Sequence, residues 1–85
     1  MNYRQEVRKL IDKLVGELKE EEALIEALKR KLTKKEFKVF VAQGEGLSKE
    51  EIAKEVRIEL DRVEEVIKAL KKKINQEKIK KELSK

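Results

Sequence analysis

The sequence predicts an all-α protein in which a long amphipathic N-terminal helix precedes a small domain of three to four helices. Three observations support this fold class. Apolar residues recur every three or four positions along most of the chain, as they do on the buried face of a helix. The chain contains no Pro, and 48% of its residues are charged. At two places a Ser or Thr is followed three residues later by Glu, which is a signal for a helix start.

Residues 3–31 are predicted to form one long helix that dimerises as a coiled coil. Its apolar residues follow steps of four, three and four and then of seven, three and four, which is a heptad pattern with one position missing. This leucine-zipper pattern favours a homodimer. The residues expected at the dimer interface are Val7, Ile11, Leu14, Leu18, Ile25 and Leu28.

Two features of this helix leave an alternative open. Leu10, Val15 and Leu24 widen the apolar stripe beyond a two-stranded seam, so the helix could instead fold back onto the rest of the chain. Glu21 occupies the missing apolar position, where it either sets the register of the pairing or marks a break in the helix. Gly16 falls on the face expected to be exposed, where it lowers helix propensity but disturbs no packing.

Two capping boxes predict helix starts in the second half of the chain. In "TKKE" and "SKEE" the hydroxyl group can accept a hydrogen bond from the amide of the Glu, whose carboxylate reaches back. We therefore expect helices to begin after Thr33 and after Ser48, and each cap to contribute about 1 kcal/mol. The "QGEG" segment between them contains two Gly, which favour a helix end and a turn.

The second capping box begins a predicted helix-turn-helix. Its first helix is expected to begin after Ser48, and a tight turn through residues 57–58 follows it. The second helix is expected to carry the next apolar residues, which are Val63, Val66, Ile67, Leu70 and Ile74. Asp61 and Glu64 again have the spacing of a capping box, at the start of the second helix.

Residues 32–74 resemble, without a gap, the helix-turn-helix domain of LuxR-type regulators and the related region 4 of sigma factors. The residues that match the family pattern are Leu32, Thr33, Glu36, Gly46, Leu47, Ser48, Glu51, Ile52, Ala53, Val56, Ile58, Val63, Leu70, Lys73 and Ile74. The order of the segments is similar, more loosely, to small zipper-plus-helix-turn-helix regulators encoded on archaeal plasmids. The resemblance implies that residues 49–56 form the positioning helix and that residues 60–73, approximately, form the recognition helix, which enters the major groove of DNA.

This predicted recognition helix is acidic where the family commonly has Lys or neutral groups. Base contacts are expected from Arg62, Glu64, Glu65 and Lys68, and phosphate contacts from Lys49, Lys71, Lys72 and Lys73. Glu can accept a hydrogen bond from cytosine N4, whereas Lys neutralises phosphates. The alternative is that the two Glu form ion pairs with Arg62 and Lys68 on a solvated face.

Residues 75–85 are expected to form a basic, loosely held helical tail. The net charge of +5 lies entirely within residues 71–85, which contain seven Lys and two Glu. Ile79 and Leu83 are out of step with Ile74, which predicts weak packing of this tail.

The inventory of side chains argues against catalysis, cofactors and a membrane location. The chain contains no Cys and no His, so disulfides, zinc sites and triad-like nucleophiles are not expected. No apolar run approaches the length of a membrane span, which predicts no membrane partner and a cytoplasmic, nucleoid-associated protein. No small-molecule ligand is evident either.

Together these features predict a small homodimeric protein that binds double-stranded DNA and regulates transcription, and not an enzyme. The alternative is a helical protein–protein interaction module, such as an adaptor or an antagonist of a transcription factor, whose acidic helix does not bind DNA.

Overall fold

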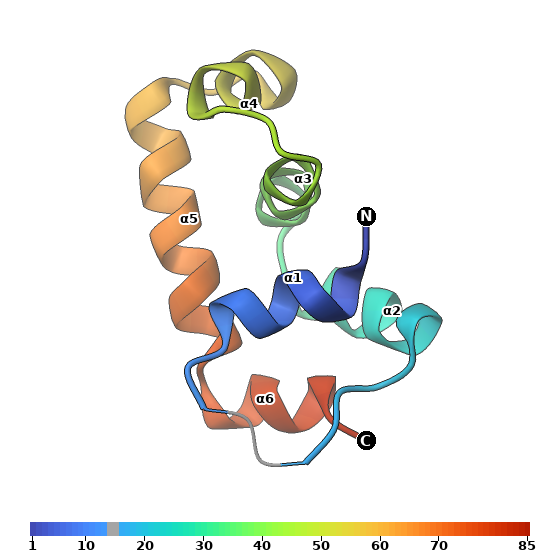
Figure 1. The fold of residues 1–85 in the computed structure, drawn as a ribbon. Coiled ribbons are helices and arrows are strands. Elements are labelled where there is room, and N and C mark those ends of the chain that lie inside the picture. Colours follow the sequence, from blue (N-terminus) through green and yellow to red (C-terminus); the bar gives the residue numbers. More distant parts are fainter. Residues whose placement is uncertain (14–15) are drawn as a thin grey trace.

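The computed structural model describes residues 1–13 and 16–85, and these residues form an all-helical fold (Figure 1). Its helices are α1 (Tyr3–Leu10), α2 (Glu21–Lys31), α3 (Lys34–Gly44), α4 (Lys49–Val56), α5 (Leu60–Ile74) and α6 (Glu77–Leu83). The first half of α5 packs against α3 and α4, and its last turns contact α1 and α6. One hydrophobic core contains residues of all three predicted segments, so these segments form a single unit. The predicted all-α class is confirmed.

The helix starts of α3 and α4 follow the two capping boxes. Thr33 Oγ1 accepts a hydrogen bond from the Glu36 amide at 3.2 Å, and the Glu36 carboxylate accepts one from the Thr33 amide at 2.9 Å. Ser48 and Glu51 make the same pair of hydrogen bonds at the start of α4, at 3.2 and 2.9 Å. Because each of these signals lies within four residues, they predict both helix starts correctly.

The third predicted capping box, at the start of α5, is wrong. The helix begins at Leu60, and its N-cap is Glu59, whose side chain makes no capping hydrogen bond. Asp61 therefore already lies in the first turn, where its negative charge still stabilises the helix through the helix dipole. The tight turn sets this start, because Arg57 ends α4 with φ 61° and Glu59 returns the chain to an extended conformation.

The predicted single helix over residues 3–31 is also wrong, since α1 and α2 are separate helices. In the connection between them, Gly16 has φ +92°, which a right-handed helix does not accommodate. Two amphipathic helices in succession reproduce the apolar spacing of a heptad pattern, so the sequence alone does not separate the two structures.

The residues predicted at a dimer interface lie mainly in the core of the single chain. Val7, Ile11, Leu18 and Leu28 are buried, and Ile25 is half-buried. Leu14 lies outside the described residues. The alternative, in which the N-terminal segment folds back onto the rest of the chain, therefore describes this structure, and the same apolar surface is not free to form a coiled coil.

Glu21 explains the missing position in the apolar pattern. It is the first residue of α2, and its carboxylate accepts hydrogen bonds from the backbone amides of Tyr3 and Arg4 at 3.3 and 3.2 Å. These amides lie in the first turn of α1, where the helix provides no partner for them. Glu21 thus caps two amides of α1 that precede it by 17 and 18 residues, in addition to the local N-cap Asn2, whose Oδ1 accepts a hydrogen bond from the Gln5 amide at 3.1 Å.

The C-terminal helix α6 is firmly packed, so the prediction of a loosely held tail is wrong. Ile79 and Leu83 are buried in the core. The chain at the end of α6 also pairs with the connection before α2, through hydrogen bonds from the Lys19 amide to the Leu83 carbonyl and from the Lys85 amide to the Glu17 carbonyl, both 2.9 Å. A break between α5 and α6 shifts the helical phase, which is why these apolar residues are out of step with α5.

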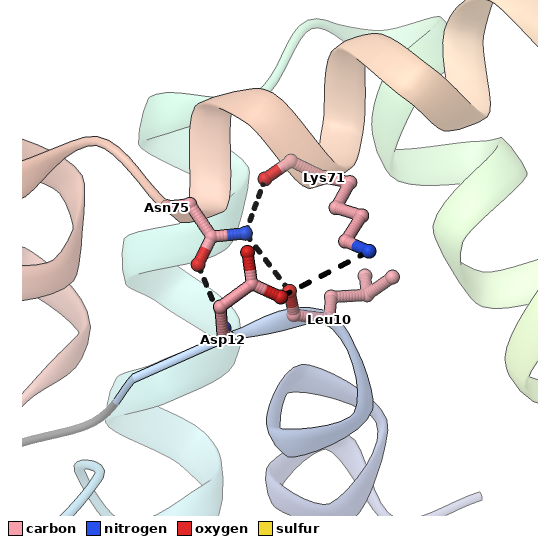
Figure 2. A network of polar contacts seen from close by, with 4 residues as sticks. All are labelled: Leu10, Asp12, Lys71 and Asn75. Atoms are coloured by element: carbon pink, nitrogen blue, oxygen red, sulfur yellow. Dashed lines mark hydrogen bonds and ion pairs between the residues drawn. The ribbon is translucent and has the colours of Figure 1, made fainter.

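Asn75 ends α5 and joins it to the end of α1 (Figure 2). Its side-chain amide donates hydrogen bonds to the carbonyls of Leu10 and Lys71 at 2.9 and 2.8 Å, and its side-chain oxygen accepts one from the Asp12 amide at 2.8 Å. One side chain thus satisfies three backbone groups at the point where two helices end. This arrangement fixes the C-terminal end of α5 against the N-terminal segment.

Candidate nucleic-acid interface

The helices α4 and α5 follow one another closely and are joined by residues 57–59. The amides of Arg57 and Ile58 both donate hydrogen bonds to the Ala53 carbonyl, the latter at 3.0 Å, and so close the end of α4. α4, α5 and α3 contact one another, which holds α5 at a fixed angle and leaves one face of it in solvent. α4 matches the predicted boundaries, and α5 extends one residue beyond its predicted end.

The exposed face of α5 changes sign along its length. Asp61, Glu64 and Glu65 are exposed in the first half, whereas Lys68, Lys71 and Lys72 are exposed in the second half. These residues are separated by three or four positions, so they lie along one face of the helix. The face therefore presents carboxylates near α4 and ammonium groups near α1 and α6.

Two exposed ion pairs involve two of the three carboxylates in the acidic half. Lys49 Nζ at the start of α4 lies 3.3 Å from a carboxylate oxygen of Glu64, and the Arg62 guanidinium lies 3.3 Å from the carboxylate of Glu65. The alternative predicted from the sequence is therefore correct for Glu65, but Glu64 pairs with Lys49 rather than with Lys68. Exposed pairs of this kind contribute between about 0 and 1 kcal/mol, so phosphates or bases can replace either partner at little cost.

The basic half borders an open hollow of about 550 Å³ between α5 and the end of α1. Lys68, Lys71 and Lys72 line it together with Asp12, Asn75 and Gln76. Lys71 Nζ lies 3.9 Å from a carboxylate oxygen of Asp12. Within residues 1–13 and 16–85, neither Lys68 nor Lys72 has an ion-pair partner. Lys68 also borders a smaller hollow of about 160 Å³ with Lys49 and Glu64. Lys68 thus connects the basic half of α5 to the start of α4.

Lys73 does not belong to this cationic face. Its ammonium group lies 2.7 Å from the Glu36 carboxylate at the start of α3, in a partly buried position. Burial alone would raise the pKa of the Glu36 carboxyl, but the hydrogen bonds from Lys73 and Thr33 outweigh this effect and hold the pKa below its usual value. Lys73 therefore ties the end of α5 to α3 and is not available as a phosphate contact.

Three residues of the basic hollow were not predicted from the sequence. Asn75 follows Lys68 by seven residues, so helical spacing alone could have placed it on the same face. Gln76 follows directly after it. Nothing in the sequence signals Asp12, because it reaches the hollow only through the fold of the N-terminal segment.

Neither protein-family models, nor curated proteins, nor solved structures give a match to this chain. The resemblance to LuxR-type domains therefore remains a prediction that rests on the matching residues alone. Of the helices described, none combines the length and the apolar character that crossing a membrane requires.

Proposed function

We propose that this protein binds double-stranded DNA through the exposed face of α5. The observation that carries this proposal is the row of three exposed lysines, Lys68, Lys71 and Lys72, on one face of α5, which is the second helix of the predicted helix-turn-helix. Lys49 lies beside this row at the start of α4 and extends it. Each of these residues is exposed, and an ammonium group on the flexible four-carbon stem of a lysine suits contact with a phosphate.

The acidic half of α5 then serves selectivity rather than affinity. Lys49 and Arg62 can exchange their carboxylate partners for DNA phosphates, which frees Glu64 and Glu65 to accept hydrogen bonds from base edges such as cytosine N4. A carboxylate also repels base edges that offer only acceptors, so it discriminates against the wrong sequence. This division of roles is consistent with a transcriptional regulator of the kind that the sequence resembles.

The charge pattern also favours a second candidate function, a protein-interaction module. Asp61, Glu64 and Glu65 form an acidic surface that would complement a basic partner protein. Under this alternative the acidic half of α5 forms the contact and the lysines do not contribute.

Binding to short random-sequence duplexes, measured by fluorescence anisotropy at several salt concentrations, tests the DNA proposal. Three or four phosphate contacts predict a slope of about −3 to −4 when log affinity is plotted against log salt. The double variant Lys68→Gln/Lys72→Gln removes two contacts, so we expect weaker binding and a slope that is shallower by about 2.

The matched control is the double variant Arg30→Gln/Lys31→Gln, which removes the same charge from the exposed end of α2. We expect it to retain the slope of the wild-type protein. The proposal is wrong if the wild-type protein binds no duplex at the lowest salt concentration, or if both double variants weaken binding equally.

A further inference from the structure

An apolar groove of about 530 Å³ lies between α3 and α4, away from the lysines of α5. Phe37, Val41, Leu47 and Val56 form its apolar lining, and Glu45 and Glu55 add two carboxylates. The N-terminal segment holds the Phe37 ring in place. The ring stacks on that of Tyr3 with 6.3 Å between the two centroids, and the Lys29 ammonium lies over it, 5.8 Å from its centroid. The groove is therefore preformed in the single chain.

The same chain exposes a side chain that suits this groove. Leu60, at the start of α5, has 41% of its surface exposed and is one of two large apolar residues that the described part of the chain leaves in solvent. Burying a leucine side chain stabilises an interface by about 1.5–3 kcal/mol, so a contact that covers Leu60 gains this free energy.

Arg57, three residues earlier, is held in an unfavourable backbone conformation. Its φ of 61° is the one positive value among the described non-glycine residues, at a helix end where Gly is usual. Residues that keep such a conformation despite its cost often serve a function. Among the ion pairs of the described residues, none includes Arg57, Glu45 or Glu55.

We propose that a second copy of this chain occupies the groove, with its Leu60 against the apolar lining and its Arg57 paired with Glu45 and Glu55. Lys38, which also lines the groove, offers an opposite charge to Glu59 and Asp61 on either side of the inserted Leu60. The groove thus matches the Leu60 segment in apolar character and in both signs of charge.

The position of the two surfaces allows the contact to close as a symmetric dimer. Val56 lines the groove, and Leu60 follows it by four residues, so groove and inserted segment lie at the same end of the molecule. Each copy can then give Leu60 to its partner and receive the partner's Leu60, as in a two-fold interface. The interface leaves the basic half of α5 free, and it does not depend on the proposed DNA binding.

Sedimentation equilibrium of the full chain over a wide concentration range tests this dimer. We expect reversible association, and a dimer dissociation constant at least about tenfold higher for Leu60→Ser, because the dimer contains two copies of the leucine contact. We expect Arg57→Gly to weaken association as well. That substitution relieves the positive φ, so a loss of association in this variant does not result from unfolding.

Charge exchange between two variants gives the most specific test. Arg57→Glu and Glu55→Arg each place like charges opposite one another in a homodimer, so we expect each variant alone to be monomeric. In a mixture of the two, the heterodimer places opposite charges at both contacts, and association should return. Lys54→Gln, which removes an exposed cation of α4 outside the groove, serves as the matched control and should associate like the wild-type protein.

Three results would overturn the proposal. The wild-type chain could sediment as a monomer at every concentration, or it could form a dimer that Leu60→Ser leaves unchanged. The third is a mixture of Arg57→Glu and Glu55→Arg in which association does not return. Circular dichroism of each variant confirms that the helices are retained, so that each outcome reports on the interface.

Discussion

The helices α3 and α4 begin under local control alone, whereas α1, outside the α3–α5 unit, is also held by distant residues. Thr33 and Ser48 cap α3 and α4 through partners three residues away. In α1 a local cap is joined by distant contacts. Asn2 Oδ1 accepts a hydrogen bond from the Gln5 amide at 3.1 Å, but Glu21 caps two further amides that precede it by 17 and 18 residues, and the Asn75 amide reaches the end of α1 across 65 residues. The first kind of contact forms with its own helix, but the second kind forms only when the whole chain has folded.

This difference predicts that the two regions respond differently to the loss of one side chain. A local cap contributes mainly to its own helix, so its removal loosens that helix. A side chain that joins distant helices leaves unpaired backbone groups on several elements when it is removed, and each unpaired group carries its own cost.

The largest effect is expected for Asn75→Ala. This substitution removes three hydrogen bonds and leaves the Asp12 amide and the Leu10 carbonyl without their partner, so the free energy of unfolding should fall by about 2–3 kcal/mol. Chemical denaturation followed by circular dichroism measures this change. Gln76→Ala, at the exposed neighbouring position, should change the free energy of unfolding by less than about 0.5 kcal/mol. Equal effects of the two substitutions would show that Asn75 does not join the two regions.

Glu21→Ala and Ser48→Ala are expected to lower the free energy of unfolding by a smaller amount. The two substitutions should also loosen different helices. Each removes a helix cap, and each should lower the free energy of unfolding by about 1 kcal/mol. Hydrogen exchange separates them. Ser48→Ala should raise exchange in the first turn of α4, whereas Glu21→Ala should raise it in the first turn of α1. Raised exchange confined to α2 in the Glu21 variant would contradict the assignment of this residue as the cap of α1.

The same division explains which parts of the fold could be predicted from the sequence. The starts of α3 and α4 depend on signals within four residues, and both are predicted correctly. The start of α5 depends on the backbone of Arg57, a residue whose type does not indicate a positive φ, and there the predicted capping box is wrong. The break between α1 and α2 depends on which surface buries Val7 and Leu18, and a periodic pattern does not say whether that surface belongs to the same chain.

The candidate site was predictable to a similar degree. Helical spacing places Lys68, Lys71 and Lys72 on one face of α5, and the structure brings them to one hollow. The pairing of Glu64 with Lys49 requires the packing of α4 on α5, and the pairing of Lys73 with Glu36 requires the packing of α3 on α5. Sequence separation therefore limits the prediction of charged partners, even where each residue and its helix are assigned correctly.

The smallest expected effect concerns two ion pairs, one in each region, and their dependence on pH. The pKa of the Glu36 carboxyl is lowered by Lys73 and Thr33 against the opposing effect of burial, and hydrogen bonding to Lys85 lowers the pKa of the Glu20 carboxyl. A carboxyl whose pKa is depressed by folding adds stability above its unfolded pKa of about 4.3, and this stability is lost as the pH falls through the folded pKa. The stability that both ion pairs add near neutral pH is therefore lost in the acidic range.

Lys73→Gln should reduce this acid sensitivity more than Lys85→Gln does. The Glu36 side chain is only 12% exposed, whereas that of Glu20 is 71% exposed and is screened by water and salt. Near neutral pH we expect Lys73→Gln to lower the free energy of unfolding by about 0.5–1 kcal/mol, and the loss to shrink as Glu36 becomes protonated. Denaturation curves at several pH values between neutral and acidic measure how the free energy of unfolding of each variant depends on pH. A larger change in acid sensitivity for Lys85→Gln in physiological salt would contradict this prediction. It would show that the stability of the helices around the α3–α5 unit depends more on charge than that of the unit itself.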